Sequence, residues 1–318
     1  MKKPLIVIAG PTAVGKSDTA IRLAKRIGGE IISADSMQIY KELNIGTAKV
    51  TEEEKAGVTH HMLDVFNPDF SCDVALYKDD VKKIIDDILS RGKIPILCGG
   101  TGFYIQAVTR DIDFSEEEPN DIREKYTKFY EEHGEDALFK KLKEVDEEST
   151  LIIPKQNIKR VIRALEFYEV HNKKISDHNR EQSEKESSYN LAYFVINMNR
   201  KELYERIDMR VDIMMNLGLL DEVKSLIDKY DYSSSSGFYN AIGYKEIIEY
   251  LDGQYDLDRA VELIKQNSRH YAKRQITFFK REKDAIWLDR DLLSQDEILD
   301  KIIKVLADKS IILLNKYI

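Results

Sequence analysis

The amino-acid sequence predicts an α/β fold in which a parallel sheet is flanked by helices and interrupted by an all-helical insertion domain. Short apolar runs recur along the chain, and the segments between them have the periodicity of helices, which together favour the sheet. No alternating strand pattern occurs between residues 116 and 188, which favours the insertion. We therefore predict a core at residues 1–115 and 189–318, with C-terminal helices, and a helical domain at residues 116–188.

The composition limits the classes of protein to which the chain can belong. Its 318 residues, 42% hydrophobic and 33% charged, suffice for two domains or for one large domain with an insertion. No apolar run approaches the roughly 20 residues that cross a bilayer, so we expect no membrane partner. Two cysteines, Cys72 and Cys98, are too few for a disulfide framework, and we expect reduced thiols in a cytoplasmic protein. The net charge of −8 argues against general nucleic-acid binding but leaves room for a local basic surface.

A glycine-rich motif follows the first predicted strand, Leu5 to Ala9, and leads into a predicted helix, Ser17 to Ile27. It reads Gly10-Pro11-Thr12-Ala13-Val14-Gly15-Lys16-Ser17, the G-x-x-x-x-G-K-S spacing of a P-loop. The two glycines permit positive φ, so that successive backbone N–H groups can face an anion at the start of the helix. Lys16 adds a positive charge, and Ser17 adds a hydroxyl that can bind Mg²⁺. These features predict a P-loop NTPase-like sheet that holds a diphosphate or triphosphate. The alternative is a glycine turn that only joins a strand to a helix.

Two further turns follow predicted strands. Asp35-Ser36-Met37-Gln38 comes after the strand Glu30 to Ser33, and Gly99-Gly100-Thr101-Gly102 comes after the strand Ile94 to Cys98. Ligands of open α/β sheets gather at the carboxyl ends of the strands, so we expect both turns to face the ligand of the P-loop. There Asp35 can bind a metal, accept a proton or hydrogen-bond an amine, and Thr101 supplies a hydroxyl. Each turn also has a purely local interpretation, with Asp35 as a turn cap and the glycines as a tight strand-to-helix connection.

The adjacent histidines His60 and His61, followed by Asp64, invite interpretation as a metal site. Neighbouring residues of a strand point to opposite faces of a sheet, however, so we do not expect this pair alone to bind zinc.

Basic side chains gather in three segments of this acidic chain. Arg206 and Arg210 stand four residues apart and can present two guanidinium groups on one helical face toward a diphosphate. Lys159, Arg160 and Arg163 share one side of a predicted helix that starts near Gln156. The segment Ser268 to Arg281 contains five Lys or Arg residues and no acid, beside an apolar stripe. Such faces can hold nucleic-acid phosphates, although an ordinary solvated face has the same composition.

Taken together, these stretches resemble the bacterial tRNA dimethylallyltransferases, also called tRNA isopentenyltransferases. The resemblance covers nearly the whole chain in the right order. The matching segments are Gly10 to Ser17, Ile31 to Tyr40, Asn44 to Lys49, His60-His61, Gly99 to Ile105, Arg160 to Glu166, Ala241 to Glu246 and Tyr271 to Gln275. One departure is Ile153, which precedes Pro154 where relatives commonly have a histidine.

The resemblance implies transfer of a dimethylallyl group from dimethylallyl diphosphate to N6 of the adenosine 3′-adjacent to the anticodon in tRNA, with release of diphosphate. It implies that Gly10 to Ser17 and Arg210 hold the diphosphate, with Mg²⁺ near Ser17, and that Asp35 is the general base with Thr101 at the reacting pair. The target base would be flipped out of its stack. The residues expected to contact tRNA are Asp35, Ser36, Met37, Gln38, Thr101, Arg123, Lys159, Arg160, Val161, Ile162, Arg163, Lys273 and Arg274. We expect a monomer that acts on the anticodon stem-loop.

Other classes of protein remain open on these residues. A P-loop small-metabolite kinase would also use Lys16, Ser17 and Mg²⁺, with ATP as the donor, but it leaves the basic segment at Ser268 to Arg281 unexplained. An isopentenyltransferase acting on free adenine nucleotides would need no basic helices. An RNA-binding module that only senses a nucleotide would leave Asp35 and Thr101 without a chemical role.

Overall fold

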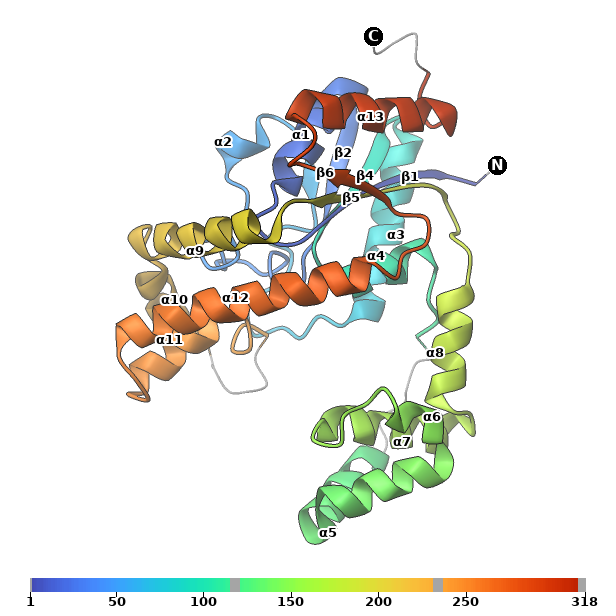
Figure 1. The fold of residues 1–318 in the computed structure, drawn as a ribbon, viewed down its shortest axis with the longest axis vertical. Helices are drawn as coiled ribbons and strands as arrows, with labels where there is room; N and C mark the ends of the chain where they lie inside the picture. Colours follow the sequence, from blue (N-terminus) through green and yellow to red (C-terminus); the bar gives the residue numbers. More distant parts are fainter. Residues whose placement is uncertain (1, 115–120, 231–236, 314–318) are drawn as a thin grey trace. The chain divides into compact units, whose positions relative to one another are not determined.

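The computed structural model describes residues 2–114, 121–230 and 237–313, and these fall into two compact units (Figure 1). Unit 1 comprises Met1–Asp111 and Ser187–Ile318, and unit 2 comprises Ile112–Glu186. The predicted start of the helical insertion, residue 116, lies outside the described residues.

Unit 1 is built on a six-stranded sheet in which every pairing is parallel, and this confirms the predicted fold class. The strand order is β3-β2-β4-β1-β5-β6. The bounds are β1 Pro4–Ala9, β2 Gly29–Ala34, β3 His60–His61, β4 Ile94–Gly99, β5 Asn190–Asn197 and β6 Ile286–Asp289. The sequence did not predict β6, because four residues with one buried side chain carry no readable alternation.

Both faces of the sheet are covered by helices, as an all-parallel sheet requires. Along β1, Leu5 and Val7 face one core, which α3, α4, α10, α11 and α12 complete, and Ile6 and Ile8 face another, which α1 and α13 complete. Helices α9 and α12 contribute to both cores. The bounds are α1 Lys16–Ile27, α2 Glu52–Lys55, α3 Val74–Ser90, α4 Gly102–Thr109, α9 Arg200–Asn216, α10 Leu219–Lys229, α11 Tyr244–Leu251, α12 Leu257–Phe279 and α13 Gln295–Asp308. None of the described helices has the length and apolar character needed to cross a membrane.

Unit 2 contains only helices among its described residues. They are α5 Ile122–Val145, α6 Glu147–Thr150, α7 Ile158–His171 and α8 Ile175–Glu184. Helix α5 breaks at Gly134, where φ is 79° and ψ is 178°. The carboxylate of Asp146, 1% exposed, accepts hydrogen bonds from the backbone N–H and the hydroxyl of both Ser149 and Ser176, and so joins α6 to α8.

A buried carboxylate organises the amino-terminal end of the sheet. The Glu30 side chain, 2% exposed, accepts two hydrogen bonds from Arg91 at 2.6 and 2.8 Å and one from Lys93 at 2.7 Å. His61 Nε2 lies 2.8 Å from the same carboxylate, while His60 Nδ1 lies 2.9 Å from the Val58 carbonyl oxygen. The two histidines therefore have separate partners. Within the described ranges, no group of three or more His, Cys, Asp or Glu side chains is placed to hold a metal ion.

We expect Glu30→Gln to lower the free energy of unfolding by about 2 kcal/mol at neutral pH, because a buried carboxylate that joins two cations is lost. Hydrogen bonding from Arg91, supported by Lys93 and His61, holds the pKa of Glu30 well below its ordinary value of 4.5. The stabilisation is therefore complete above that ordinary value and is lost as the pH falls below it.

Urea unfolding at several pH values measures the difference in the free energy of unfolding between Glu30→Gln and wild type. Glu262→Gln, which removes an exposed ion pair with Arg259, is the matched control and should leave stability near wild type. Equal stability of wild type and Glu30→Gln at neutral pH would contradict the assignment.

Candidate active site

The three predicted turns meet because their strands are neighbours in the sheet. The P-loop follows β1, the turn at Asp35 follows β2, and the turn at Thr101 follows β4, which lies between them. The ends of β2 and β4 are in direct contact: a Cβ atom on Gly99 would lie 2.1 Å from the Ala34 carbonyl oxygen, so only glycine fits there. The Thr101 N–H donates to that same oxygen at 3.0 Å. The carboxyl ends of the three strands thus form one site.

The P-loop has the backbone conformation that its sequence predicts. Gly10 and Gly15 have φ of 154° and 92°, which confirms the expected positive angles. A Cβ atom on Gly10 would also lie 2.5 Å from the Ile196 carbonyl oxygen of β5. Helix α1 begins at Lys16, so its unpaired backbone N–H groups and its positive dipole end lie at the P-loop. This is the arrangement that binds anions in other proteins.

Four cationic side chains gather at the P-loop, and each donates a hydrogen bond to an oxygen atom of a P-loop residue. Lys16 Nζ donates to the Pro11 carbonyl at 3.1 Å, and Arg210 Nη1 donates to the Thr12 hydroxyl at 3.1 Å. Arg206 Nε donates to the Ala13 carbonyl at 3.0 Å, and Arg290 Nη1 donates to the Val14 carbonyl at 3.1 Å. Arg290 was missed by the sequence interpretation, since it follows the unpredicted strand β6 and carries no local signal.

The electrostatics of this end of the sheet favour a multiply charged anion. Burial lowers the pKa of the Lys16 ammonium, and the Arg210 guanidinium lowers it further, while the nearby thiol of Cys98 and the carboxylate of Asp35 act in the opposite direction. Burial likewise lowers the pKa of Arg210, against the opposing influence of Asp35. Neighbouring cations that depress one another's pKa gain stability from an added negative charge.

Asp35 combines the two interpretations that the sequence left open. Its Oδ1 atom accepts hydrogen bonds from the backbone N–H of Met37 at 2.9 Å and of Gln38 at 3.3 Å, so it does cap the turn. Its side chain also lines two cavities at this end of the sheet. The second carboxylate oxygen, Oδ2, has no hydrogen bond from any other described residue. The turn therefore fixes the carboxylate while leaving one oxygen for a ligand.

Thr101 ties the turn after β4 to the turn after β2. Its Oγ1 atom accepts a hydrogen bond from the Ser36 N–H at 3.1 Å and lies 3.5 Å from the Ser36 hydroxyl. Tyr271 of α12 adjoins this pair: burial and the charge of Asp35 raise its pKa to about 12, while hydrogen bonds with Thr101 and Gln275 lower it. The sequence did not predict a site role for Tyr271, which was named only in the segment Tyr271 to Gln275 that carries the family resemblance.

Two cavities adjoin one another at this end of the sheet and share several lining residues. The larger, about 760 Å³, is lined by P-loop residues that include Lys16 and Ser17 and extends past Arg206. The smaller, about 280 Å³, has an apolar wall that includes Val211, Met214 and Ile264. Both are lined by Thr12, Asp35, Thr47, Arg210 and Tyr271. Asp35 therefore stands where an anion in one cavity and an organic group in the other can meet.

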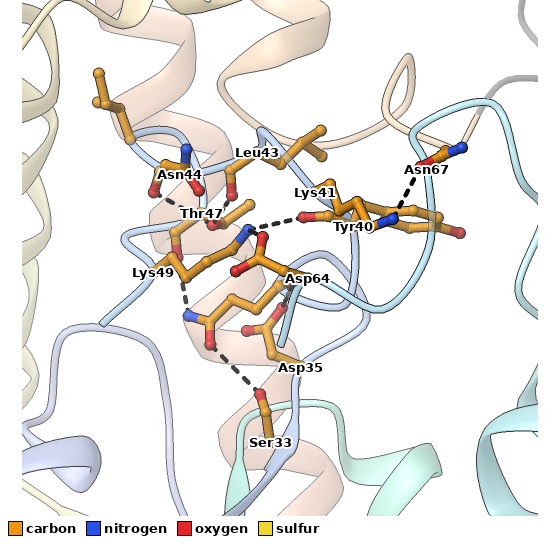
Figure 2. A network of polar contacts seen from close by, with 12 residues as sticks. Ser33, Asp35, Tyr40, Lys41, Leu43, Asn44, Thr47, Lys49, Asp64 and Asn67 are labelled. Carbon is orange, nitrogen blue, oxygen red and sulfur yellow. Dashed lines mark hydrogen bonds and ion pairs between the residues drawn. The ribbon is translucent and has the colours of Figure 1, made fainter. Parts of the chain in front are cut away.

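The loop at residues 44–49 forms one wall of both cavities and is held by Glu222 of α10. The Glu222 carboxylate accepts hydrogen bonds from three successive backbone N–H groups, those of Asn44, Ile45 and Gly46, at 3.1, 2.8 and 3.1 Å. Figure 2 shows the adjoining network, in which Lys49 reaches both the Tyr40 carbonyl at 2.7 Å and Asp64 at 2.6 Å. The loop carbonyls of Thr47 and Ala48 in turn accept from the Gln38 amide at 3.1 and 3.4 Å.

Apart from Thr101, the residues expected to contact tRNA lie in three places. Asp35, Ser36, Met37 and Arg274 line the smaller cavity, and Gln38 lines the larger one. On the exposed side of α12, a shallow groove is lined by His270, Lys273, Arg274, Thr277, Phe278 and Arg281. The third group lies in unit 2.

In unit 2, Glu166 gathers two of the predicted basic residues. Its carboxylate, buried within the unit, accepts from Arg123 Nη2 at 2.7 Å and lies 3.8 Å from Arg163 Nη1. Lys159 and Arg160 are exposed in the first turn of α7. Val161 and Ile162 are only 0% and 6% exposed and pack in the core of the unit, so their side chains are not presented to solvent.

Comparisons with known proteins give a consistent result. A family model described as IPP transferase matches residues 38–282. The chain is 49% identical over 316 residues to a tRNA dimethylallyltransferase of Lachnoclostridium phytofermentans, covering 98% of this chain and 99% of the relative.

Solved structures give the same picture. The tRNA isopentenylpyrophosphate transferase of Bacillus halodurans has 40% identity and a TM-score of 0.73, with 97% of each chain covered. A eukaryotic dimethylallyltransferase acting on tRNA has 30% identity and a TM-score of 0.82, covering 97% of this chain and 79% of that one.

Arg210→Ala should weaken binding of inorganic diphosphate by about 10- to 100-fold, because a buried guanidinium contributes one or two charge-assisted hydrogen bonds. Isothermal titration calorimetry measures the dissociation constant directly. Arg200→Ala on the same helix removes a guanidinium that lies over the Tyr204 ring, 5.1 Å from its centroid, and lines neither cavity. Arg200→Ala should leave the dissociation constant for inorganic diphosphate unchanged. If both variants lost the same amount of affinity, the loss would reflect only the removal of a positive charge.

Proposed function

Because the chain belongs to the IPP transferase family, we propose that it transfers a dimethylallyl group from dimethylallyl diphosphate to N6 of the adenosine 3′-adjacent to the anticodon in tRNA. The observation that supports this reaction best is the position of Asp35. Its carboxylate lies at the junction between a cavity lined by the P-loop and a cavity with an apolar wall. A leaving diphosphate and an acceptor base would meet at that point.

The larger cavity suits the leaving group. The diphosphate of the donor would be bound by the P-loop backbone, residues Gly10 to Ser17, together with Lys16, Arg206, Arg210 and Arg290. As the bond between C1 of the dimethylallyl group and the diphosphate oxygen breaks, the electron pair leaves with the diphosphate. Cations fixed before the reaction stabilise this developing charge without having to reorganise.

The smaller cavity suits the acceptor. An adenine base that has left its stack would enter it past Ser36, Met37 and Arg274, with N6 directed at Asp35. The bond from N6 to C1 forms as the bond from C1 to the diphosphate breaks, and Asp35 takes the N6 proton as general base. Thr101, bonded to the Ser36 N–H, would hold the acceptor turn in place.

Magnesium fits this site only together with the substrate. Ser17 presents an exposed hydroxyl in the first turn of α1, while the neighbouring Asp18 carboxylate is engaged by Arg22 at 2.9 Å. Mg²⁺ in such sites has few protein ligands and is bound mainly by substrate phosphates and water, so the Ser17 hydroxyl would be completed by the diphosphate. When bound, the ion would neutralise charge on the leaving diphosphate.

The RNA would be held by surfaces outside the cavities. The basic groove of α12, which includes Lys273 and Arg274, and the exposed Lys159 and Arg160 of unit 2 are suited to phosphates of the anticodon stem-loop. Every group invoked in the reaction comes from one chain, so we propose that a monomer suffices. The unpaired thiols of Cys72 and Cys98 suit the reducing cytoplasm, where we place the reaction.

The reaction is tested by incubating the protein with Mg²⁺, labelled dimethylallyl diphosphate and an unmodified anticodon stem-loop RNA, beside AMP and ATP as alternative acceptors. Label in RNA alone is the expected result. Label in AMP would reassign the chain to transfer onto free nucleotides. No transfer, combined with phosphorylation of a small metabolite from ATP, would favour the kinase that the P-loop also permits.

Asp35→Asn should lower the rate of transfer by about 10²- to 10⁴-fold, because the amide keeps the turn cap but cannot accept the N6 proton. Binding of the stem-loop RNA should be retained. Single-turnover transfer and a filter-binding titration separate the two effects. The control is Asp212→Asn on α9, which removes an exposed carboxylate paired with Lys265 and should transfer normally. Full activity of Asp35→Asn would remove Asp35 as the base.

A double variant, Lys159→Ala with Arg160→Ala, should weaken tRNA binding and reduce the slope of log affinity against log salt by about one for each phosphate that is no longer neutralised. Transfer at saturating RNA should change little, since neither side chain is needed for the bond-making step. Lys173→Ala, which breaks an ion pair with Glu181 elsewhere in unit 2, is the control. If the double variant kept the wild-type slope of log affinity against log salt, Lys159 and Arg160 would not contact RNA phosphates.

A further inference from the structure

Gln275 lies at the centre of the site although it is neither charged nor exposed. It belongs to α12, and its side chain is 5% exposed. Its Oε1 atom accepts a hydrogen bond from the Thr12 N–H at 2.9 Å, and its Nε2 atom donates to the Gly100 carbonyl at 2.9 Å. A backbone N–H can only donate and a carbonyl can only accept, so these two partners fix the orientation of the amide.

The two partners belong to the two halves of the site. Thr12 is in the P-loop, and its hydroxyl accepts from Arg210. Gly100 immediately precedes Thr101, which is bonded to Ser36 beside Asp35. A single side chain thus joins the turn proposed to hold the leaving group to the turn proposed to hold the acceptor.

The contact between the two turns is close enough to restrict which residues can form it. A Cβ atom on Gly100 would lie 2.1 Å from Gln275 Nε2 and 3.4 Å from the Gly10 carbonyl oxygen. Glycine at position 100 therefore admits the amide between the turns. Beyond the last paired residues of β1 and β4, Ala9 and Gly99, one rigid, planar group therefore spans the gap between the P-loop and the Thr101 turn.

We propose that Gln275 is a positioning residue that sets the separation between the diphosphate and the attacking nitrogen. The inference rests on the proposed function. Displacement at C1 requires the entering nitrogen, the carbon and the leaving oxygen to be aligned at near-contact distances, and a misplacement of about 1 Å can cost about 10²-fold in rate. Gln275 lines the larger cavity, but in this scheme it acts through its hydrogen bonds to Thr12 and Gly100 and not through a bond to either reacting group.

Only a primary amide meets both requirements at neutral pH. Methionine has a similar shape, but its thioether has no proton to donate to the Gly100 carbonyl and is only a weak acceptor for the Thr12 N–H. Glutamate can accept from the Thr12 N–H, but its carboxylate has no proton for the Gly100 carbonyl. A protonated glutamic acid, in contrast, offers one acceptor and one donor and so imitates the amide.

The first test is Gln275→Met. We expect kcat to fall about 10²-fold. The KM for dimethylallyl diphosphate and the dissociation constant for inorganic diphosphate should stay within about threefold of wild type, because the groups that bind the anion remain. The matched control is Gln295→Met, which removes a 3.0 Å hydrogen bond from α13 to Thr19 on α1. It should change the melting temperature similarly while leaving kcat intact. Wild-type kcat in a folded Gln275→Met protein would overturn the proposal.

The second test uses Gln275→Glu and does not depend on how well the methionine variant folds. Burial raises the pKa of a glutamate at this position, so the transfer rate relative to wild type should rise as the pH is lowered from about 8 to about 6. Taking the ratio to wild type at each pH cancels every pH dependence that the two proteins share. A ratio that does not change with pH would show that Gln275 merely fills space. If wild type itself transfers no label to RNA, the proposed function fails, which is distinct from failure of this inference.

Discussion

The site depends on one constraint, the direct contact between the carboxyl ends of neighbouring parallel strands. Gly99 lies against the Ala34 carbonyl, and Gly10 lies against the Ile196 carbonyl, each at a distance that no side chain would allow. These contacts bring β2, β4, β1 and β5 to one edge without intervening side chains. The P-loop, Asp35 and Thr101 then lie together because sheet order leaves them no other place.

Around that edge, charge is distributed unevenly although the chain as a whole is acidic. Four cations bind oxygens of the P-loop, and the larger cavity beside them is also lined by three carboxylates, those of Asp18, Asp35 and Glu54. The cations come from α1, α9 and the segment after β6, so helices far apart in the sequence supply a single field. Glu30 and Glu166, which pair with cations elsewhere, lie outside the two cavities and serve the scaffold.

The sequence predicted those features whose cause is local. The P-loop follows from glycine spacing, the strands β1, β2 and β4 from apolar runs, and the helical insertion from the lack of alternation. It could not predict Arg290 or the bridge made by Gln275, because both depend on which distant segments meet. Asp35 is an intermediate case. The sequence predicted its place after β2, but only the structure shows that its carboxylate both caps the turn and lines the cavity.

Strand β1 is synthesised long before one of the two strands with which it pairs, and this affects the nascent chain. Strand β1 pairs with β4 on one side and with β5 on the other, and β5 begins only at Asn190, after the whole of unit 2. Until then β1 is an edge strand whose backbone donors and acceptors are exposed, flanked by apolar side chains that lack their final cover. Unit 2 has its own core and can collapse in the meantime. On the ribosome, β1 therefore remains open to intermolecular pairing until β5 has emerged.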